Sequence, residues 1–190
     1  CIRKFKKALY NTNDNDFTLK GKMGRELRTM TVGVMGTGKI GFTIIKCLSG
    51  FGCRIIANDV YENDAVRAYA EYVDLDTLYR ESDIITIHTP LLPETTGMID
   101  REAIAKMKDG VVIINTSRGT NVDEAALLAA LESGKVRAAG LDVYADEPAS
   151  NSALYSHPMV SCTPHIGAAT VEAQKRIGAE IVDIITNFGK

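Results

Sequence analysis

The sequence predicts an α/β domain built on a doubly wound, mainly parallel sheet. Three observations support this fold class. Short apolar runs alternate with segments of helical periodicity from residue 31 onward. The runs are apolar throughout instead of alternating with polar residues, which is typical of strands buried on both faces. The first run ends in a glycine-rich turn that opens directly into a helical segment.

In the first half of the chain, apolar and β-branched runs predict strands at Thr31–Met35, Cys53–Asn58 and Asp83–His88. Apolar residues at helical spacing predict helices over Ile40–Leu48, over Asp64–Tyr69, and from near Asp76, where Leu75, Leu78 and Tyr79 could pack together. Residues 89–93 contain Pro90 and Pro93 and are expected to form a loop, because proline supplies no hydrogen-bond donor to a sheet.

The second half repeats the alternation. A helix is expected over Arg101–Met107 and a buried strand over Gly110–Asn115. The segment Asp123–Ser133 is rich in Ala and Leu and predicts a helix that stops at Gly134. Further strands are expected at Ala138–Val143 and Met159–Cys162, and a long closing helix at Gly167–Phe188.

The turn Gly36-Thr37-Gly38-Lys39-Ile40-Gly41 has the G-x-G-x-x-G spacing of a dinucleotide-binding turn. The first glycine permits the tight turn, the second lets the backbone approach a pyrophosphate, and the third lets helix and strand pack closely. Free N–H groups and the positive end of the helix then face the phosphates. By itself this spacing is a weak signal, because glycines also mark ordinary turns.

A carboxylate strengthens the interpretation. Asp59 ends the second strand, 18 residues after Gly41, where a parallel strand places an acid for the adenosine ribose hydroxyls. The alternative is a turn residue at a strand end, since Asn58-Asp59 is prone to turns. The upstream glycines favour the ribose role, and a carboxylate here would repel a 2′-phosphate. The sequence therefore predicts NAD as cofactor in preference to NADP.

Composition limits the other functional classes. The chain has 190 residues, 45% of them apolar, with a net charge of −2 and a pI near 6.0, so no general attraction to nucleic acid or membranes is expected. No run approaches the roughly 18 apolar residues of a membrane span, and the start lacks a signal-peptide layout. A cytoplasmic protein is expected. The cysteines form no C-x-x-C pair, and Cys162 with His165 offers too few ligands for a metal site.

In an open parallel sheet, ligands bind beyond the carboxyl ends of the strands. Arg118 follows an apolar strand there, where a guanidinium could clamp a carboxylate with two hydrogen bonds; the alternative is a solvated arginine. His165 follows the last short strand, but a structural histidine or helix cap fits that position too. His88 also ends a strand and could serve packing alone. The residues leave open whether Glu147, in a polar loop, reaches His165.

Six motifs follow in order: the glycine turn, His-Thr-Pro-Leu-Leu-Pro-Glu-Thr-Thr-Gly, Asn-Thr-Ser-Arg-Gly, Gly-Leu-Asp-Val-Tyr, Asp-Glu-Pro and Thr-Pro-His-Ile-Gly-Ala. With them the chain closely resembles the D-isomer-specific 2-hydroxyacid dehydrogenase family from about Leu19 to Ile185. The later motifs look most like D-3-phosphoglycerate dehydrogenases, and the entry around residues 16–27 looks more like D-lactate dehydrogenases. The resemblance covers the Rossmann-like NAD-binding domain of the family, without its substrate domain.

The resemblance implies roles for named residues. Arg118 falls on the arginine that binds the substrate carboxylate, Glu147 on the acid partner, and His165 on the histidine that transfers a proton. The interval from Glu147 to His165 is rather short for the family. The cofactor contacts implied by the glycine turn and the resemblance come from Gly36, Thr37, Gly38, Lys39, Ile40, Gly41, Asp59, Thr89, Pro90, Thr116, Ser117, Arg118, Asp142, His165, Gly167 and Ala168.

The expected organisation is a lead-in linker and helix over residues 1–28, coming from an absent substrate domain, and a dinucleotide-binding domain over residues 29–190. The resemblance implies hydride transfer between NAD(H) and C2 of a D-2-hydroxy or 2-oxo acid, in a homodimer. Because the substrate domain is missing, this piece is expected to bind NAD and to be poorly active alone. The alternatives are an NAD(H)-sensing protein like the corepressors that share this fold, and a nucleotide-binding module for another ligand.

Overall fold

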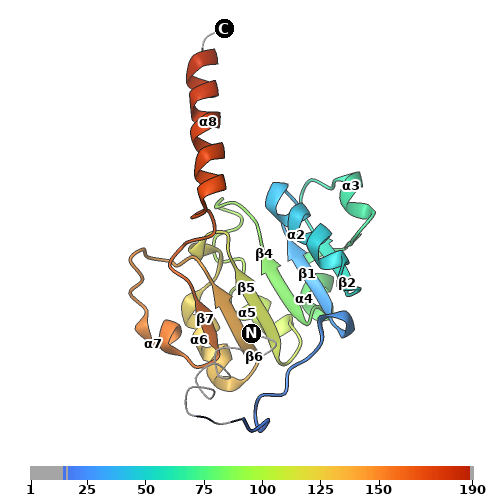
Figure 1. Cartoon of the computed structure of the whole chain (residues 1–190). Helices are drawn as coiled ribbons and strands as arrows, with labels where there is room; N and C mark the ends of the chain where they lie inside the picture. The colour runs from blue at the N-terminus through green and yellow to red at the C-terminus, as the bar shows by residue number, and fades with distance from the viewer. Residues whose placement is uncertain (1–14, 16, 189–190) are drawn as a thin grey trace.

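The computed structural model describes residue 15 and residues 17–188 (Figure 1). Residues 1–14 and residue 16 of the lead-in linker and helix expected over residues 1–28 lie outside the described residues. Within them, seven parallel strands form one sheet in the order β3-β2-β1-β4-β5-β6-β7. The strands are β1 (Thr31–Met35), β2 (Arg54–Asn58), β3 (Glu71–Tyr72), β4 (Ile84–Ile87), β5 (Val111–Asn115), β6 (Val136–Leu141) and β7 (Val160–Cys162).

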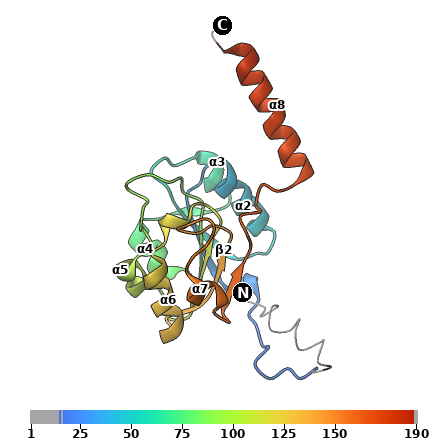
Figure 2. The same cartoon turned by 90° about the vertical axis from the view of Figure 1, so that its left-hand side faces the viewer.

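Helices connect the strands and cover both faces of the sheet. α4, α5 and α6 lie on one side and α2 on the other (Figure 2). This arrangement confirms the doubly wound α/β fold that the alternating runs predict. The helices are η1 (Leu27–Thr29), α2 (Lys39–Ser49), α3 (Asp64–Arg67), α4 (Leu75–Glu81), α5 (Arg101–Lys106), η2 (Gly119–Asn121), α6 (Glu124–Ser133), α7 (Ser152–Ser156) and α8 (Val171–Asn187).

Two apolar clusters stabilise the layers. One contains Ile85, Ile113 and Leu127 and lies between the sheet and α4, α5 and α6. The other contains Val34 and Ile45 and joins the opposite face to α2. All five of these side chains are fully buried, and burying a side chain of this size contributes about 1.5–3 kcal/mol. The continuous apolar character of the strands follows from this double coverage.

The register of the strands fixes the place of the site. Successive pairings join Asn58, Met35, Ile87, Asn115, Leu141 and Cys162 in one row across the sheet. This row lies at the carboxyl ends of the strands, so the residues that follow it emerge along one edge. The strand order reverses direction between β1 and β4, which opens a crevice where ligands bind in such sheets.

Several elements differ from the sequence prediction. β3 is not predicted, because a strand of two residues, Glu71 and Tyr72, is too short to give an apolar run. β6 lies at Val136–Leu141 instead of 138–143, since Arg137 interrupts the apolar run at its start and the pairing with β5 ends at Leu141. α3 ends at Arg67, before the expected Tyr69. The expected stop at Gly134 is confirmed, because this residue caps α6 with φ +80°.

The last helix, α8, leaves the body of the domain (Figures 1 and 2). It begins at Val171, after the cap residue Thr170, and not at the expected Gly167. None of its residues is buried. Its apolar side chains Ile181, Ile184 and Ile185 are 50–70% exposed. α8 therefore does not contribute to the core of this domain.

Candidate functional site

The glycine turn joins β1 to α2 with the geometry that each glycine position requires. Gly36 has φ +87°, and a Cβ on it would lie 2.8 Å from the His88 carbonyl carbon and oxygen. A Cβ on Gly41 would lie 1.9 Å from the Gly36 carbonyl oxygen, so this glycine allows α2 to approach the turn. At Gly38 a Cβ would meet nothing within 4 Å. The space beside Gly38 and the uncapped start of α2 fit an approaching pyrophosphate.

Asp59 lies beside this turn at the end of β2. Its Oδ2 accepts hydrogen bonds from the Thr37 N–H at 2.6 Å and the Thr37 hydroxyl at 3.1 Å, and its Oδ1 accepts the Tyr61 N–H at 3.0 Å. The Tyr72 hydroxyl lies 2.8 Å from the Thr37 hydroxyl and accepts the Asn63 N–H. The carboxylate is therefore held next to the glycine turn, where it fits the ribose of a dinucleotide.

Buried amides join the loops after β4 and β5. Asn121 is fully buried, and its Nδ2 donates to the Thr89 carbonyl and hydroxyl at 3.2 and 3.0 Å and to the Ser117 hydroxyl at 3.2 Å. Asn115 accepts from the Ser117 N–H and hydroxyl and donates to the Arg118 carbonyl at 2.9 Å. Asn121 Oδ1 is buried without a hydrogen-bond partner among the described residues. The hydrogen bonds that the two amides donate and accept hold the backbone at Thr89 and Arg118 in one arrangement.

The Arg118 loop lies against the loop after β6. A Cβ on Gly119 would lie 1.9 Å from the carbonyl carbon and oxygen of Tyr144, so a glycine is required for this approach. The Arg118 side chain is exposed, and its Nη1 donates to the Ser117 carbonyl at 2.7 Å. The remaining donors of the guanidinium fork are those that could bind a carboxylate.

Glu147 and His165 form the pair on which the site depends. His165 Nδ1 lies 2.8 Å from Glu147 Oε2, and Glu147 Oε1 accepts the Tyr144 N–H at 3.3 Å. The hydrogen bond to His165, together with that from Tyr144, lowers the pKa of the Glu147 carboxyl. A carboxylate can only accept, so Nδ1 donates and Nε2 is left to exchange a proton. The short interval between the two residues does not prevent their contact.

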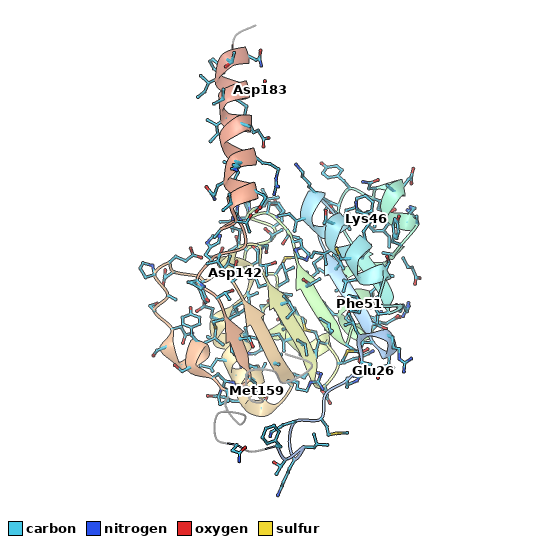
Figure 3. The ribbon with its side chains drawn as sticks, in the orientation of Figure 1. Glu26, Lys46, Phe51, Asp142, Met159 and Asp183 are labelled. Carbon is cyan, nitrogen blue, oxygen red and sulfur yellow. The ribbon has the colours of Figure 1, made fainter. Side chains whose placement is uncertain are left out.

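Asp142 holds the turn that presents His165. It is 7% exposed and accepts hydrogen bonds from the Thr163 hydroxyl at 2.6 Å and from the Ile166 and Gly167 N–H groups at 2.9 Å. Burial raises the pKa of Asp142, but these hydrogen bonds outweigh it and lower the pKa overall. His165 has φ +53°, a backbone region that disfavours side chains with a Cβ. Figure 3 shows Asp142 at the carboxyl end of the sheet, near the start of α8.

A cavity of about 270 Å³ brings the three candidate catalytic residues together. Arg118, Glu147 and His165 all line it, together with Leu91 and Tyr144. An arginine, a carboxylate and an imidazole around one small cavity suit a substrate with a carboxylate and an oxygen that gains or loses a proton.

The other candidate residues lie along the same edge. Lys39 and Ile40 are exposed in the first turn of α2, Pro90 and Thr116 are exposed in the loops after β4 and β5, and Ala168 is exposed after the His165 turn. His88 is not one of them: its Nε2 lies 2.9 Å from the Thr86 hydroxyl, and burial lowers its pKa to about 4. Its contacts agree with a packing role under Gly36.

The described residues contain no group of three or more His, Cys, Asp or Glu side chains arranged to hold a metal ion. Among the same residues, no helix is both long enough and apolar enough to cross a membrane.

Sequence reasoning missed the residues that support the site. Asn115 and Asn121 carry a weak signal, since an amide beside an apolar strand needs buried partners. Tyr72 carries no signal in the sequence. Tyr144 ends the Gly-Leu-Asp-Val-Tyr motif, but the motif does not indicate what its hydroxyl contacts. The Tyr72 hydroxyl meets Thr37 and the Tyr144 hydroxyl donates to the Thr163 carbonyl, and these partners are far apart in the sequence.

Comparison with known proteins places this geometry in a family. The family model "D-isomer specific 2-hydroxyacid dehydrogenase, NAD binding domain" matches residues 1–167. The chain is 46% identical to a hydroxypyruvate reductase of Thermotoga maritima over 188 residues, which is 97% of this chain and 61% of that protein. It is 46% identical to a D-3-phosphoglycerate dehydrogenase of Mycobacterium bovis over 164 residues, 85% of this chain and 31% of that protein.

A solved structure agrees with these relatives. D-lactate dehydrogenase from Aquifex aeolicus, complexed with NAD and lactic acid, superposes with a TM-score of 0.91 at 33% identity, over 98% of this chain and 62% of that one. The chain thus spans less than two thirds of these longer proteins. The chain belongs to the D-isomer-specific 2-hydroxyacid dehydrogenases and corresponds to their NAD-binding domain.

Proposed function

We propose that the protein containing this chain is an NAD-dependent dehydrogenase that interconverts a D-2-hydroxy acid and its 2-oxo acid. The observation that carries this proposal is the common cavity of Arg118, Glu147 and His165, on the same sheet edge as the glycine turn and Asp59. The relatives reported above are named as reductases and dehydrogenases, which supports an enzyme over an NAD(H)-sensing corepressor.

The cofactor is bound by the turn and the loops at this edge. In the proposal, the glycine turn from Gly36 to Gly41, which leads into the first turn of α2, binds the pyrophosphate, and Asp59 accepts hydrogen bonds from the adenosine ribose. Thr89, Pro90, Thr116 and Ser117 extend the contact along the edge, and Asp142, Gly167 and Ala168 lie at the nicotinamide end. When bound, NAD supplies the hydride acceptor or donor of the reaction.

Each of the three polar residues of the cavity has a separate role toward the substrate. Arg118 binds the substrate carboxylate and polarises the oxygen on C2. His165 exchanges a proton with that oxygen through Nε2, because Nδ1 is committed to Glu147. Glu147 fixes the tautomer of His165 and stabilises its charged form, as a carboxylate does for a catalytic imidazole.

The proposal names the class of the substrate, a D-2-hydroxy or 2-oxo acid, and no single member of that class. The relatives are named for hydroxypyruvate, phosphoglycerate and lactate, and the cavity of this chain presents groups for the shared carboxylate and C2 oxygen. We propose that a second domain of the whole protein closes the cleft and selects the side chain. Residues 1–190 alone would then bind NAD(H) and turn over substrate poorly, because closure excludes water and completes the site.

Two further properties are part of the proposal. The whole protein is a homodimer, as the resemblance implies, which sedimentation of the purified protein would test. It acts in the cytoplasm, in keeping with the absence of a membrane-spanning helix among the described residues.

The test is a panel of 2-oxo acids offered to the whole protein with NADH or NADPH. The proposal expects NADH-dependent reduction of at least one acid, with a D-configured product on a chiral column. Reduction of none of the acids by a protein that binds NADH would sink the dehydrogenase assignment.

A further inference from the structure

One carboxylate ties the segment that carries Glu147 to the start of α6. Glu124 Oε1 accepts the Ala145 N–H at 2.9 Å, and the Tyr155 hydroxyl lies 2.9 and 3.0 Å from Oε1 and Oε2. Asn151 Nδ2 donates to Oε2 at 3.4 Å. These three partners flank Glu147 on both sides in the sequence, so one side chain fixes the segment before and after it.

The chemistry of Glu124 suits this position. All three of its partners are donors, and a carboxylate is the side-chain group that only accepts. Glu124 is half-buried. Burial, followed by the hydrogen bond to Glu124, raises the pKa of Tyr155, so its hydroxyl keeps the proton that it donates. An amide in place of this carboxylate would turn an N–H group toward a donor and leave it unpaired.

The contacts continue from Tyr155 to the His165 turn. The Tyr155 and Tyr144 rings meet edge to face, with centroids 4.8 Å apart at 81°. The Tyr144 N–H donates to Glu147, and its hydroxyl donates to the Thr163 carbonyl at 2.5 Å, two residues before His165. Tyr144 thus touches both loops that must meet for Glu147 and His165 to pair.

Glu124 also connects this assembly to the Arg118 loop. It follows that loop by six residues, through η2, and Gly119 in between lies against the Tyr144 backbone. The same short segment therefore carries Arg118 at one end and anchors the Glu147 loop at the other. Glu124 does not line the cavity of the candidate catalytic residues.

We propose that Glu124 is a positioning residue that aligns Glu147 on His165 through its bonds to Ala145 and Tyr155. This inference rests on the proposed function, because that function gives Glu147 its part in catalysis. Glu124 touches neither substrate nor cofactor in this account, so its effect passes through the geometry of Glu147.

The first test is spectroscopic and needs no turnover. In the whole protein, the proton on His165 Nδ1 gives a downfield proton resonance, assigned by its disappearance in His165→Asn and Glu147→Gln. Glu124→Gln is expected to remove or broaden this resonance. Tyr155→Phe, which keeps the ring on Tyr144, is expected to weaken it. The matched control is Glu132→Gln, the same chemical change on an exposed residue of α6, which should leave it unchanged.

The second test is a double-mutant cycle on kcat. Glu124→Gln is expected to lower kcat by about 10- to 100-fold, since a misplacement of about 1 Å can cost about 100-fold. NADH affinity should stay within about twofold, because the hydrogen bonds of Glu124 go to Ala145, Asn151 and Tyr155, none of which is a candidate cofactor residue. In a Glu147→Gln background the same change should cost less than about twofold, as for two residues that act through one contact.

The outcomes separate the two proposals. Equal losses of kcat from Glu124→Gln in both backgrounds would overturn the positioning role, as would a wild-type resonance in that variant. If Glu147→Gln leaves kcat unchanged while Glu124→Gln still removes the resonance, the positioning of Glu147 stands and its proposed role in the reaction fails.

Discussion

Gly119 is the position where a single methyl group should disturb the site most directly. In Gly119→Ala the new Cβ would start 1.9 Å from the Tyr144 carbonyl carbon and oxygen. An ordinary carbon contact is about 3.5 Å, so the two backbones must separate by about 1.6 Å. Both are backbone atoms, which cannot turn away as a flexible side chain can. We expect a loss of about 1–3 kcal/mol in the free energy of unfolding.

The same displacement would move Arg118 away from the Glu147 loop. We therefore expect kcat/KM of the whole protein to fall by about 100-fold, as for other misplacements of this size. The assays are urea denaturation followed by circular dichroism and steady-state reduction of the preferred 2-oxo acid with NADH.

Gly178→Ala is the matched control. A Cβ on Gly178 would meet nothing within 4 Å, and the residue lies in α8. Alanine there should leave kcat/KM unchanged and favour the helix by up to about 1 kcal/mol. The reasoning would be refuted if Gly119→Ala kept its free energy of unfolding within about 0.5 kcal/mol of wild type and kept wild-type kcat/KM.

Three further predictions concern the cofactor end and the pH dependence of stability. Asp59→Ala should weaken NADH binding and reduce the preference for NADH over NADPH by about tenfold or more, measured by calorimetry; an unchanged preference would contradict the ribose role. Tyr72→Phe should reduce the free energy of NADH binding by about 0.5–1.5 kcal/mol, the net contribution of one hydrogen bond, because the Thr37 hydroxyl beside the glycine turn loses a partner. His88 has a folded-state pKa of about 4, below its ordinary value of 6.5, so the unfolded chain binds the proton first and stability falls as the pH drops from 6.5 to 4. Denaturation across this range should show a loss of up to about 3 kcal/mol that His88→Gln removes.

The fold follows from local signals in the sequence because its strands are buried on both faces. Continuous apolar runs such as Val111–Asn115 have no other stable place in a domain of this size. β3 lacks that signal, since Glu71–Tyr72 pairs with the edge of β2 and needs no burial on both sides. α8 is the opposite case: its helical period is clear in the sequence, but that period does not indicate that the helix lies outside the core.

Some parts of the site can likewise be predicted from the sequence, and others cannot. The glycine turn and Asp59 can be located from the sequence because the turn chemistry and the strand spacing are local. The place of Arg118 on the sheet edge follows from the strand before it. The pairing of Glu147 with His165 does not, since it depends on contacts among Glu124, Tyr144 and Tyr155 that no spacing encodes.

His165 carries the central claim, and single-turnover oxidation of NADH by the whole protein tests it most directly. Wild type and His165→Asn, each in excess over NADH and at a concentration that binds all of it, are mixed with a saturating concentration of the preferred 2-oxo acid, and the rate of NADH oxidation is followed. We expect the rate with bound NADH to be at least about 100-fold lower in His165→Asn, which is the size of effect that general acid–base catalysis supplies. A variant that oxidises NADH at the wild-type rate would contradict it.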